Sequence, residues 1–464
     1  MKRALAMALG AMLVMGSAGS ASAASQVDFS GNYIVYAMNH WNETFVDSDG
    51  KTHDSFIHHR LRLNFAFHAT DEVSVYWRFH APDSKRFGTG TIIGDNNRGV
   101  RVRYAYGEVK QDWGTFSIGR LKPAYGNFGL STLGWEPGWA DGGGWVGPGG
   151  VMFDADDDSD GIRWSNRWDN GFQLIAQFNR LNQDTRAGLS GGFTGDTEWS
   201  DRFTLEPSYF WDGGGASLGF IYERMRADDG LKAFYLNPAF AHSWGDFSVH
   251  FEGKFGWGKY DWGHPVFGLD DKASGYGLYL DFDYNYGPGN VTLAGWWLSG
   301  TAWDATKSKS LVDTGGGGWS PLLVAYNGNA TGWNRAGSSA VNVANARSGD
   351  GFSDANHWAI NLQGNHAFTD DVTLGYSLAY LGLNKTGRYF DVDGAHNFGK
   401  GIGFEADLGL TVQLLDNLTF GTAFGYLFTG KAFDQFSGFD ANGRATFDRA
   451  ADAYVWHNTL TFSF

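Results

Sequence analysis

Residues 276–286 read YGLYLDFDYNY, and this stretch decides the fold class. Every second residue from Tyr276 to Tyr286 is an aromatic residue or a leucine, whereas the positions between them include Asp281 and Asp283. Successive side chains of a β-strand point to opposite faces, so this segment predicts a strand with one apolar face and one charged face.

The same alternation recurs in residues 404–414, FEADLGLTVQL, where Glu405 and Asp407 lie on the polar face. A strand of a soluble sandwich would also alternate, so the pattern alone does not say which face is outside. Aromatic residues at strand ends favour a membrane barrel, which carries an aromatic girdle at each lipid headgroup layer. Tyr276 and Tyr286 bracket one apolar face in this way. We therefore expect the apolar faces to contact lipid and the polar faces to enclose a lumen.

Strands of this kind recur along the whole chain. We count about 18, with 16 possible, and they begin near Val27, Ser55, Asp71, Arg98, Trp113, Ser159, Asn170, Thr197, Gly214, Leu231, Gly245, Ala273, Gly289, Ser353, Asp370, Gly399, Asp416 and Ala450. Short turns such as residues 168–171 and 287–290 alternate with longer loops, the largest of which span 121–158 and 300–351. An even strand number and this alternation are typical of a closed barrel with both chain ends in the periplasm. The predicted fold is an all-β, transmembrane antiparallel β-barrel over residues 24–464, with no second domain.

The composition agrees with a barrel. The chain has 68 Gly, 37 Phe, 20 Trp and 20 Tyr but only 9 Pro, a mixture that favours strands and turns. After residue 25 no stretch approaches the roughly 18 uninterrupted apolar residues of a helical span. The absence of Cys fits an exported protein without disulfides.

The N-terminus carries the pattern of a secretory signal peptide, residues 1–23. Lys2 and Arg3 precede an apolar run over residues 4–15, and Ala21-Ser22-Ala23 closes the segment before cleavage after Ala23 or Ala24. A membrane anchor is less favoured because the apolar run is much shorter than the roughly 20 residues of a span. Cleavage leaves 33 basic against 50 acidic side chains, and so acidic a chain excludes nucleic acid as a partner.

Alternation places six arginines toward the lumen on the second to fifth strands. They are Arg60, Arg62, Arg78, Arg101, Arg103 and Arg120. A guanidinium turned toward lipid near the bilayer midplane would cost roughly 2 to 4 kcal/mol, so a water-filled lumen suits these side chains. They predict a basic wall in a pore; ion pairs that hold the barrel wall together are the alternative.

An acidic run follows the Gly- and Trp-rich part of the third long loop. Its carboxylates are Asp154, Asp156, Asp157, Asp158 and Asp160. If the loop folds into the barrel opposite the arginines, it narrows the pore and creates a transverse field. A solvated surface loop is the alternative.

The same run resembles the opening of a calcium loop, in which carboxylates at alternate positions precede Gly161. The last ligand position would be Arg167 in place of a bidentate Glu. The 13 His are scattered and predict no metal cluster. We therefore expect no metal and no cofactor.

Several short motifs resemble the general porins of Gram-negative outer membranes. They are RYAYG at 103–107, IGR at 118–120, GIRWSN at 161–166 and NGF at 170–172. The resemblance is clearest over residues 27–178 and implies an inward-folded third extracellular loop and a homotrimer. The loop tip WEPG at 135–138 departs from the porin pattern. Residues 401–430 are similar to the 18-stranded alginate-export type of channel, which implies an anionic polysaccharide substrate.

These observations predict a porin in the outer membrane of a Gram-negative bacterium, surrounded by its lipid. Small hydrophilic solutes and ions would diffuse passively through a pore constricted by the arginines and the acidic loop. The alternative is a substrate-specific channel for saccharides or an anionic polysaccharide. The sequence shows no constellation of nucleophile, base and orienting acid, so we expect no enzymatic activity.

Overall fold

The computed structural model describes residues 26–42, 53–87, 101–121, 159–181, 200–224, 231–259, 271–302, 305, 307–311, 322–325, 355–448 and 450–464. The barrel strands are β1 (Gln26–Trp41), β2 (His53–His68), β3 (Val73–Phe87), β4 (Arg101–Gln111), β5 (Gly114–Leu121), β6 (Ser159–Arg167), β7 (Phe172–Leu181), β8 (Ser200–Trp211), β9 (Gly214–Arg224), β10 (Lys232–Trp244), β11 (Phe247–Lys259), β12 (Lys272–Asn285), β13 (Gly289–Leu298), β14 (His357–Thr369), β15 (Val372–Leu383), β18 (Gly401–Leu415), β19 (Leu418–Thr429) and β22 (Ala453–Ser463). Each starts within four residues of its predicted position. The count is 18, not 16.

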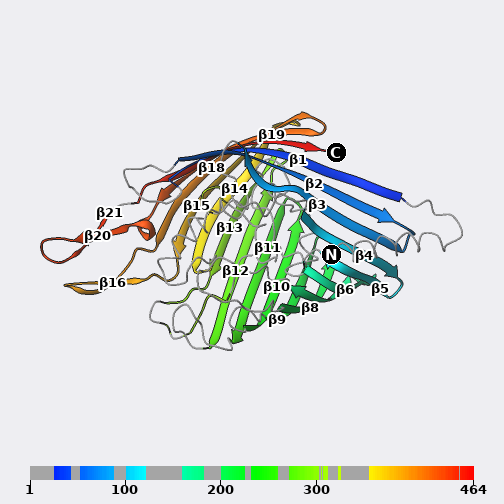
Figure 1. Cartoon of the computed structure of the whole chain (residues 1–464), viewed down its shortest axis with the longest axis horizontal. Coiled ribbons are helices and arrows are strands. Elements are labelled where there is room, and N and C mark those ends of the chain that lie inside the picture. Colours follow the sequence, from blue (N-terminus) through cyan, green and yellow to red (C-terminus); the bar gives the residue numbers. More distant parts are fainter. Residues whose placement is uncertain are drawn as a thin grey trace.

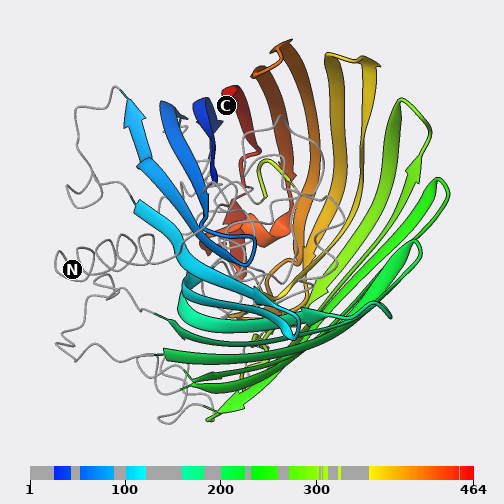
Figure 2. The ribbon, with the colours of Figure 1, turned by 90° about the vertical axis from the view of Figure 1, so that its right-hand side faces the viewer.

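The sheet closes on itself (Figures 1 and 2). Each strand pairs antiparallel with the next, and β1 pairs both with β2 and with the last strand, β22. At this seam the backbone N–H of Gly31 donates to the carbonyl of Phe464 at 2.8 Å, and that of Phe464 donates to the carbonyl of Gly31 at 3.0 Å. The barrel therefore has no free edge strand in this sheet.

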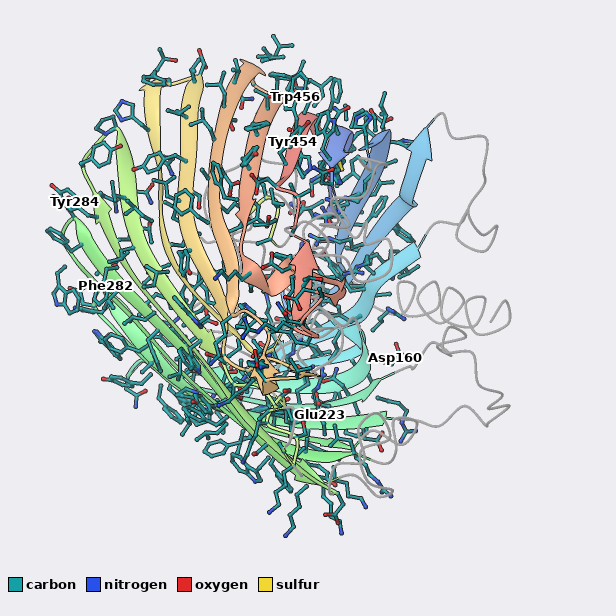
Figure 3. The ribbon with its side chains drawn as sticks, turned by 90° about the vertical axis from the view of Figure 1, so that its left-hand side faces the viewer. Asp160, Glu223, Phe282, Tyr284, Tyr454 and Trp456 are labelled. Atoms are coloured by element: carbon teal, nitrogen blue, oxygen red, sulfur yellow. The ribbon has the colours of Figure 1, made fainter. Side chains whose placement is uncertain are left out.

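The two faces of the wall differ as the alternation predicts. On β12, the ring of Phe282 is 55% exposed on the outside, whereas Asp281 is 3% exposed. On β18, Leu408 is 54% exposed and Asp407 is 4% exposed. Figure 3 shows the rings of Phe282 and Tyr284 projecting from the outer face of the wall. An apolar outside and a charged inside suit a wall between hydrocarbon and a polar lumen.

The two ends of the barrel carry different connections. At one end the strands join through short turns, such as residues 168–171, where Trp168 N donates to Phe172 O at 2.8 Å. At the other end lie the long connections, with the hairpins β16 (Arg388–Asp391) with β17 (Gly394–Asn397) and β20 (Gln435–Phe439) with β21 (Ala445–Asp448), and the 3-10 turn η3 (Lys431–Phe433). No helix among the described residues is both long and apolar enough to cross a membrane. The long loops of such barrels are extracellular and the short turns are periplasmic, so the end with the long connections faces the outside of the cell.

Candidate functional site

Four arginines on β2, β3 and β4 form one cluster on the inner face. Strand register places Arg60 and Arg62 on the same face as Ile34, which is fully buried. Arg78 lies on the next strand, opposite Asn64, and its Nε donates to the Asn64 Oδ1 at 2.6 Å. The Arg62 side chain interacts electrostatically with Arg60, Arg78 and Arg103. We call these four residues, Arg60, Arg62, Arg78 and Arg103, the arginine wall.

Tyrosines hold the arginine wall in position. The Nη2 of Arg60 donates to the hydroxyl of Tyr36 at 3.0 Å. The guanidinium of Arg78 lies over the ring of Tyr104, 5.0 Å from its centroid. Cation–π contacts and hydrogen bonds to neutral groups orient a guanidinium without neutralising it. These contacts fix the direction of the Arg60 and Arg78 guanidinium groups on the inner face of the barrel.

A β-bulge sets the direction of Arg103. Arg78 pairs with Tyr104 but the next residue, Phe79, pairs with Val102, so Arg103 is the extra residue of β4. A bulge of this kind re-aims a side chain and lets neighbouring residues share a face. Here it allows both Tyr104, which contacts Arg78, and Arg103, which interacts with Arg62, to lie on the inner side.

Two of the predicted pore residues face outward instead. On β5, Ile118 is 53% exposed and Arg120 lies two residues further along the same face. Arg120 pairs with Asp160 of β6, which shares the outer face with the 41% exposed Ile162. The prediction that Arg120 and Asp160 line the lumen was therefore wrong. The error arises because side chains alternate between the two faces of a strand, so an offset of one position in the predicted alternation moves a side chain to the other face.

The remaining predicted site residues are not placed by the structure. Asp154, Asp156, Asp157 and Asp158 lie outside the described residues, as does the rest of the third loop. The backbone of Arg101 pairs with His80 on β3, but its side chain is not among those described.

Carboxylates line the inner face on the far side of the barrel. They lie on β8, β9, β11, β12 and β18 and are Glu206, Glu223, Glu252, Asp281, Asp283, Glu405 and Asp407, each at most 5% exposed. The third strand and the twelfth strand of an 18-membered ring are diametrically opposed, so β12, which carries Asp281 and Asp283, lies across the barrel from β3 (Figure 2). The alternation of β12 and β18 already indicated four of these carboxylates from the sequence.

Some of these carboxylates hold local ion pairs. Arg202 of β8 pairs with Glu223 of β9. The His250 ring bridges Glu252 at 3.0 Å and Asp281 at 3.3 Å. The pairs Arg202–Glu223 and His250–Asp281 join β8 to β9 and β11 to β12, and sequence reasoning did not find them because their partners lie 21 and 31 residues apart on separate strands.

One segment of a long connection lies inside the barrel. Residues 322–325 belong to the connection between β13 and β14, and three of their backbone N–H groups bond to side chains of β18. Val324 N and Ala325 N donate to the two oxygens of Glu405 at 2.6 and 2.8 Å, and Leu323 N donates to Asp407 at 3.3 Å. Hydrogen bonds to a carboxylate are stronger than those between neutral groups. We call residues 322–325 the inner segment.

The inner segment packs against an apolar part of the wall. Leu322 and its neighbours share a buried cluster with side chains such as Trp296 of β13, Leu381 of β15 and Leu427 of β19. The inner segment and these side chains therefore occupy part of the barrel interior beside β13, β15, β18 and β19. Among the described residues, no group of three or more His, Cys, Asp or Glu could hold a metal ion.

An 18-stranded barrel with an apolar outside and a charged lining defines a membrane channel. The model of the Gram-negative porin family matches residues 4–386. The chain therefore belongs to the Gram-negative porin family.

Solved structures of Pseudomonas aeruginosa proteins are similar over nearly the whole chain. OccK2 (OpdF) superposes with a TM-score of 0.53 at 10% identity, covering 95% of this chain and 98% of that chain. OccK8 (OprE) gives 0.51 at 12% identity over 95% and 98%. OpdK, solved with vanillate, gives 0.50 at 11% identity over 94% and 98%. At these identities the likeness shows the fold alone, and no curated protein matches the chain.

The family and the barrel establish the general role of the chain. It is a channel in the outer membrane of a Gram-negative bacterium and not an enzyme, and small solutes pass through it.

Proposed function

We propose that the chain is a passive diffusion channel that favours small anions. The observation that carries this proposal is the arginine wall, in which Arg62, 9% exposed, lies among three further guanidinium groups. Positive charges gathered at the side of a water-filled lumen attract anions and raise their local concentration there. Carboxylates suit the planar fork of a guanidinium, which binds them with two parallel hydrogen bonds.

The carboxylates on the opposite wall determine where in the lumen an anion passes. An anion is drawn to the arginine wall and repelled from Asp281 and Asp283 across the lumen. The resulting transverse field orients a solute whose charge and apolar body lie at different ends. Tyr76 and Tyr106, stacked at 5.1 Å beside the wall, offer apolar faces to such a solute. Vanillate, the aromatic carboxylate bound to OpdK, is therefore a suitable probe.

We extend the proposal to the parts of the chain that the structure does not describe. Residues 1–23 act as a cleaved secretory signal, and residues 24–464 form the mature barrel. The third loop folds inward and brings Asp154, Asp156, Asp157 and Asp158 toward the lumen. The channel assembles as a homotrimer, as the resemblance to general porins implies. Edman sequencing of the mature chain and its mass in detergent test the first and last of these statements.

Reversal potentials in planar bilayers under a KCl gradient test the anion preference. We expect Arg62→Gln, Arg78→Gln and Arg103→Gln together to shift the reversal potential toward cation selectivity. The matched control removes three arginines that do not line the lumen wall, Arg120→Gln, Arg180→Gln and Arg444→Gln. An unchanged reversal potential in the first variant, or an equal shift in the control, would contradict the proposal.

Added vanillate distinguishes simple diffusion from a binding site. We expect block of the KCl current that saturates with vanillate concentration, because the arginine wall would bind the carboxylate while solutes still pass by diffusion; a linear effect would indicate diffusion without a binding site. Maltose and an alginate oligomer, applied in the same way, test the saccharide and polysaccharide alternatives.

A further inference from the structure

A polar side chain interrupts the lipid-facing surface of the last barrel strand. The outward side chains of β22 alternate with buried ones and are Tyr454, Trp456, Asn458, Leu460 and Phe462. Asn458 is the only primary amide among them. Leucines between 40 and 50% exposed occupy the middle of the outer face on β8, β12, β13 and β15, at Leu205, Leu280, Leu293 and Leu378. The outer face of β22 therefore differs from those strands at Asn458.

Asn458 lies between the two aromatic girdles of the barrel. Toward the extracellular end, the ring of Tyr454 stacks on that of Trp41 of β1, with centroids 4.5 Å apart. Toward the periplasmic end, the ring centroids of Phe462 and Tyr33 are 6.3 Å apart. Asn458 is four residues along the strand from Tyr454 and four from Phe462. Because such girdles mark the two headgroup layers, the Asn458 amide lies near the middle of the hydrocarbon.

Among the residues that the structure describes, the Asn458 side chain has no hydrogen-bond partner. Other polar groups on this face bond to each other. Ser55 Oγ donates to Asn39 Oδ1 at 2.8 Å, and Trp456 Nε1 donates to Thr422 Oγ1 at 3.0 Å. A polar group held in hydrocarbon without a partner costs free energy, and acyl chains offer neither donor nor acceptor. A partner from outside this chain would remove that cost.

Short side chains flank Asn458 on both neighbouring strands. The register places Ala37 of β1 on one side of it and Thr422 of β19 on the other. Small residues at contacts between membrane segments let two backbones approach closely. The outward positions of β1, β19 and β22 between the girdles carry no Lys, Arg, Asp or Glu, so two copies of this face do not repel each other by charge. We call Ala37, Asn39, Thr422 and Asn458 the seam patch.

We propose that the seam patch packs against another copy of this chain within the bilayer and that Asn458 pairs with the Asn458 of that copy. Copies inserted in the same direction hold this residue at the same depth, and a rotation axis normal to the membrane brings the copies together there. A primary amide both donates and accepts, so the Asn458 side chains satisfy one another around such an axis. This contact rests on the homotrimer proposed above and does not depend on the anion preference of the pore.

Spin-label distances in lipid test which face lies at the contact. The chain contains no Cys, so Leu460→Cys introduces a single labelling site beside Asn458, and Leu205→Cys introduces one on the far side of the barrel. The full-length mature protein is labelled with a nitroxide, refolded into phosphatidylcholine vesicles and measured by double electron–electron resonance. We expect strong intermolecular dipolar coupling for a label at residue 460 and much weaker coupling for a label at residue 205.

Loss of the amide tests the role of Asn458 itself. Native mass spectrometry of the mature protein in detergent measures the fraction of oligomer. We expect Asn458→Leu to weaken association by about three- to tenfold, and Asn458→Gln, which keeps the amide, to associate as the wild type does. Asn166→Leu, at an outward amide near the periplasmic end of β6, is the matched control and should leave association unchanged.

The outcomes separate this contact from the other proposals. Stronger coupling at residue 205 than at residue 460, equal association of Asn458→Leu and the wild type, or equal weakening in Asn166→Leu would each overturn it. A wild type that is monomeric in both assays would overturn it together with the homotrimer, whereas the anion preference is decided separately by the reversal potential. An unchanged KCl reversal potential in Asn458→Leu shows that the variant has folded with its pore intact.

Discussion

At the scale of single residues, the direction of a guanidinium depends on the ring or carbonyl that orients it. Arg78 is held on one side by Asn64 and on the other by the face of Tyr104. A cation–π contact contributes about 0.5 to 2 kcal/mol, depending on how far water is excluded. Tyr104 therefore determines where a passing carboxylate meets Arg78.

We expect Tyr104→Leu to leave the barrel folded but to weaken block by vanillate by about three- to tenfold. The substitution keeps a large apolar side chain and removes both the quadrupole that positions Arg78 and one aromatic face. The measurement is the vanillate concentration that halves the KCl current in single channels. Tyr209→Leu, at an outer-face tyrosine that is 49% exposed, is the matched control and should not change that concentration.

A second residue-scale prediction concerns the turn before β7. Gly171 has φ +86°, and a Cβ added there would meet the carbonyl oxygen of Phe210 at 2.2 Å. We expect Gly171→Ala to destabilise the folded barrel by about 1 to 3 kcal/mol, because it combines left-handed strain with a backbone clash. Urea unfolding in lipid vesicles measures the loss. Gly107→Ala, where a Cβ meets nothing within 4 Å, is the control, and an equal loss there would contradict this explanation.

The faces on which the arginines lie could be predicted from the sequence only in part. Arg60, Arg62 and Arg78 lie on the inner face that alternation indicates, because β1 and β2 pair without a register shift and β2 pairs regularly with β3 from Leu61 to His68. Arg120 was placed on the wrong face. It lies two residues from the exposed Ile118 on β5, and residues two apart on a strand share a face. The bulge at Arg103 had no signal in the sequence, since a bulge is a property of two paired strands.

At the scale of elements, the inner segment is fastened by side chains of β18 and not by its own secondary structure. Three backbone N–H groups depend on Glu405 and Asp407. Alternation could predict that these carboxylates face inward, but it could not identify their partners, which lie 80 to 84 residues away in a long connection. Loop positions of this kind are set by tertiary contacts, whereas strand positions are set by local pattern.

We expect Glu405→Gln to loosen the inner segment and increase the open-channel noise and mean conductance. An amide offers one accepting oxygen where the carboxylate offers two, and a hydrogen bond to a charged group contributes about 1.5 to 3 kcal/mol. Single-channel recordings check the result. Glu72→Gln, in an exposed turn at the opposite end, should leave the trace unchanged. A quiet trace of unaltered conductance in Glu405→Gln would mean that the apolar cluster alone holds the segment.

At the scale of the whole molecule, all 18 strands depend on a single seam between β1 and β22. The strand number and the faces of the wall could be predicted because they follow from a repeated local pattern. The seam itself could be expected only from the need to leave no open edge in lipid. Its last contact is the reciprocal pair of hydrogen bonds between Gly31 and Phe464, with the Phe464 ring 5.6 Å from that of Phe29.

We expect deletion of Phe464 to weaken closure more than Phe464→Leu does. The deletion removes both hydrogen bonds, each worth about 0.5 to 1.5 kcal/mol, and the ring contact, whereas the leucine keeps the hydrogen bonds. Refolding of the purified mature chain from urea into lipid vesicles measures the folded fraction by the mobility of unheated samples on gels. This assay contains no assembly factor, so it reports closure alone. If both variants lose the same folded fraction, the aromatic ring and not the backbone seam stabilises the closed barrel.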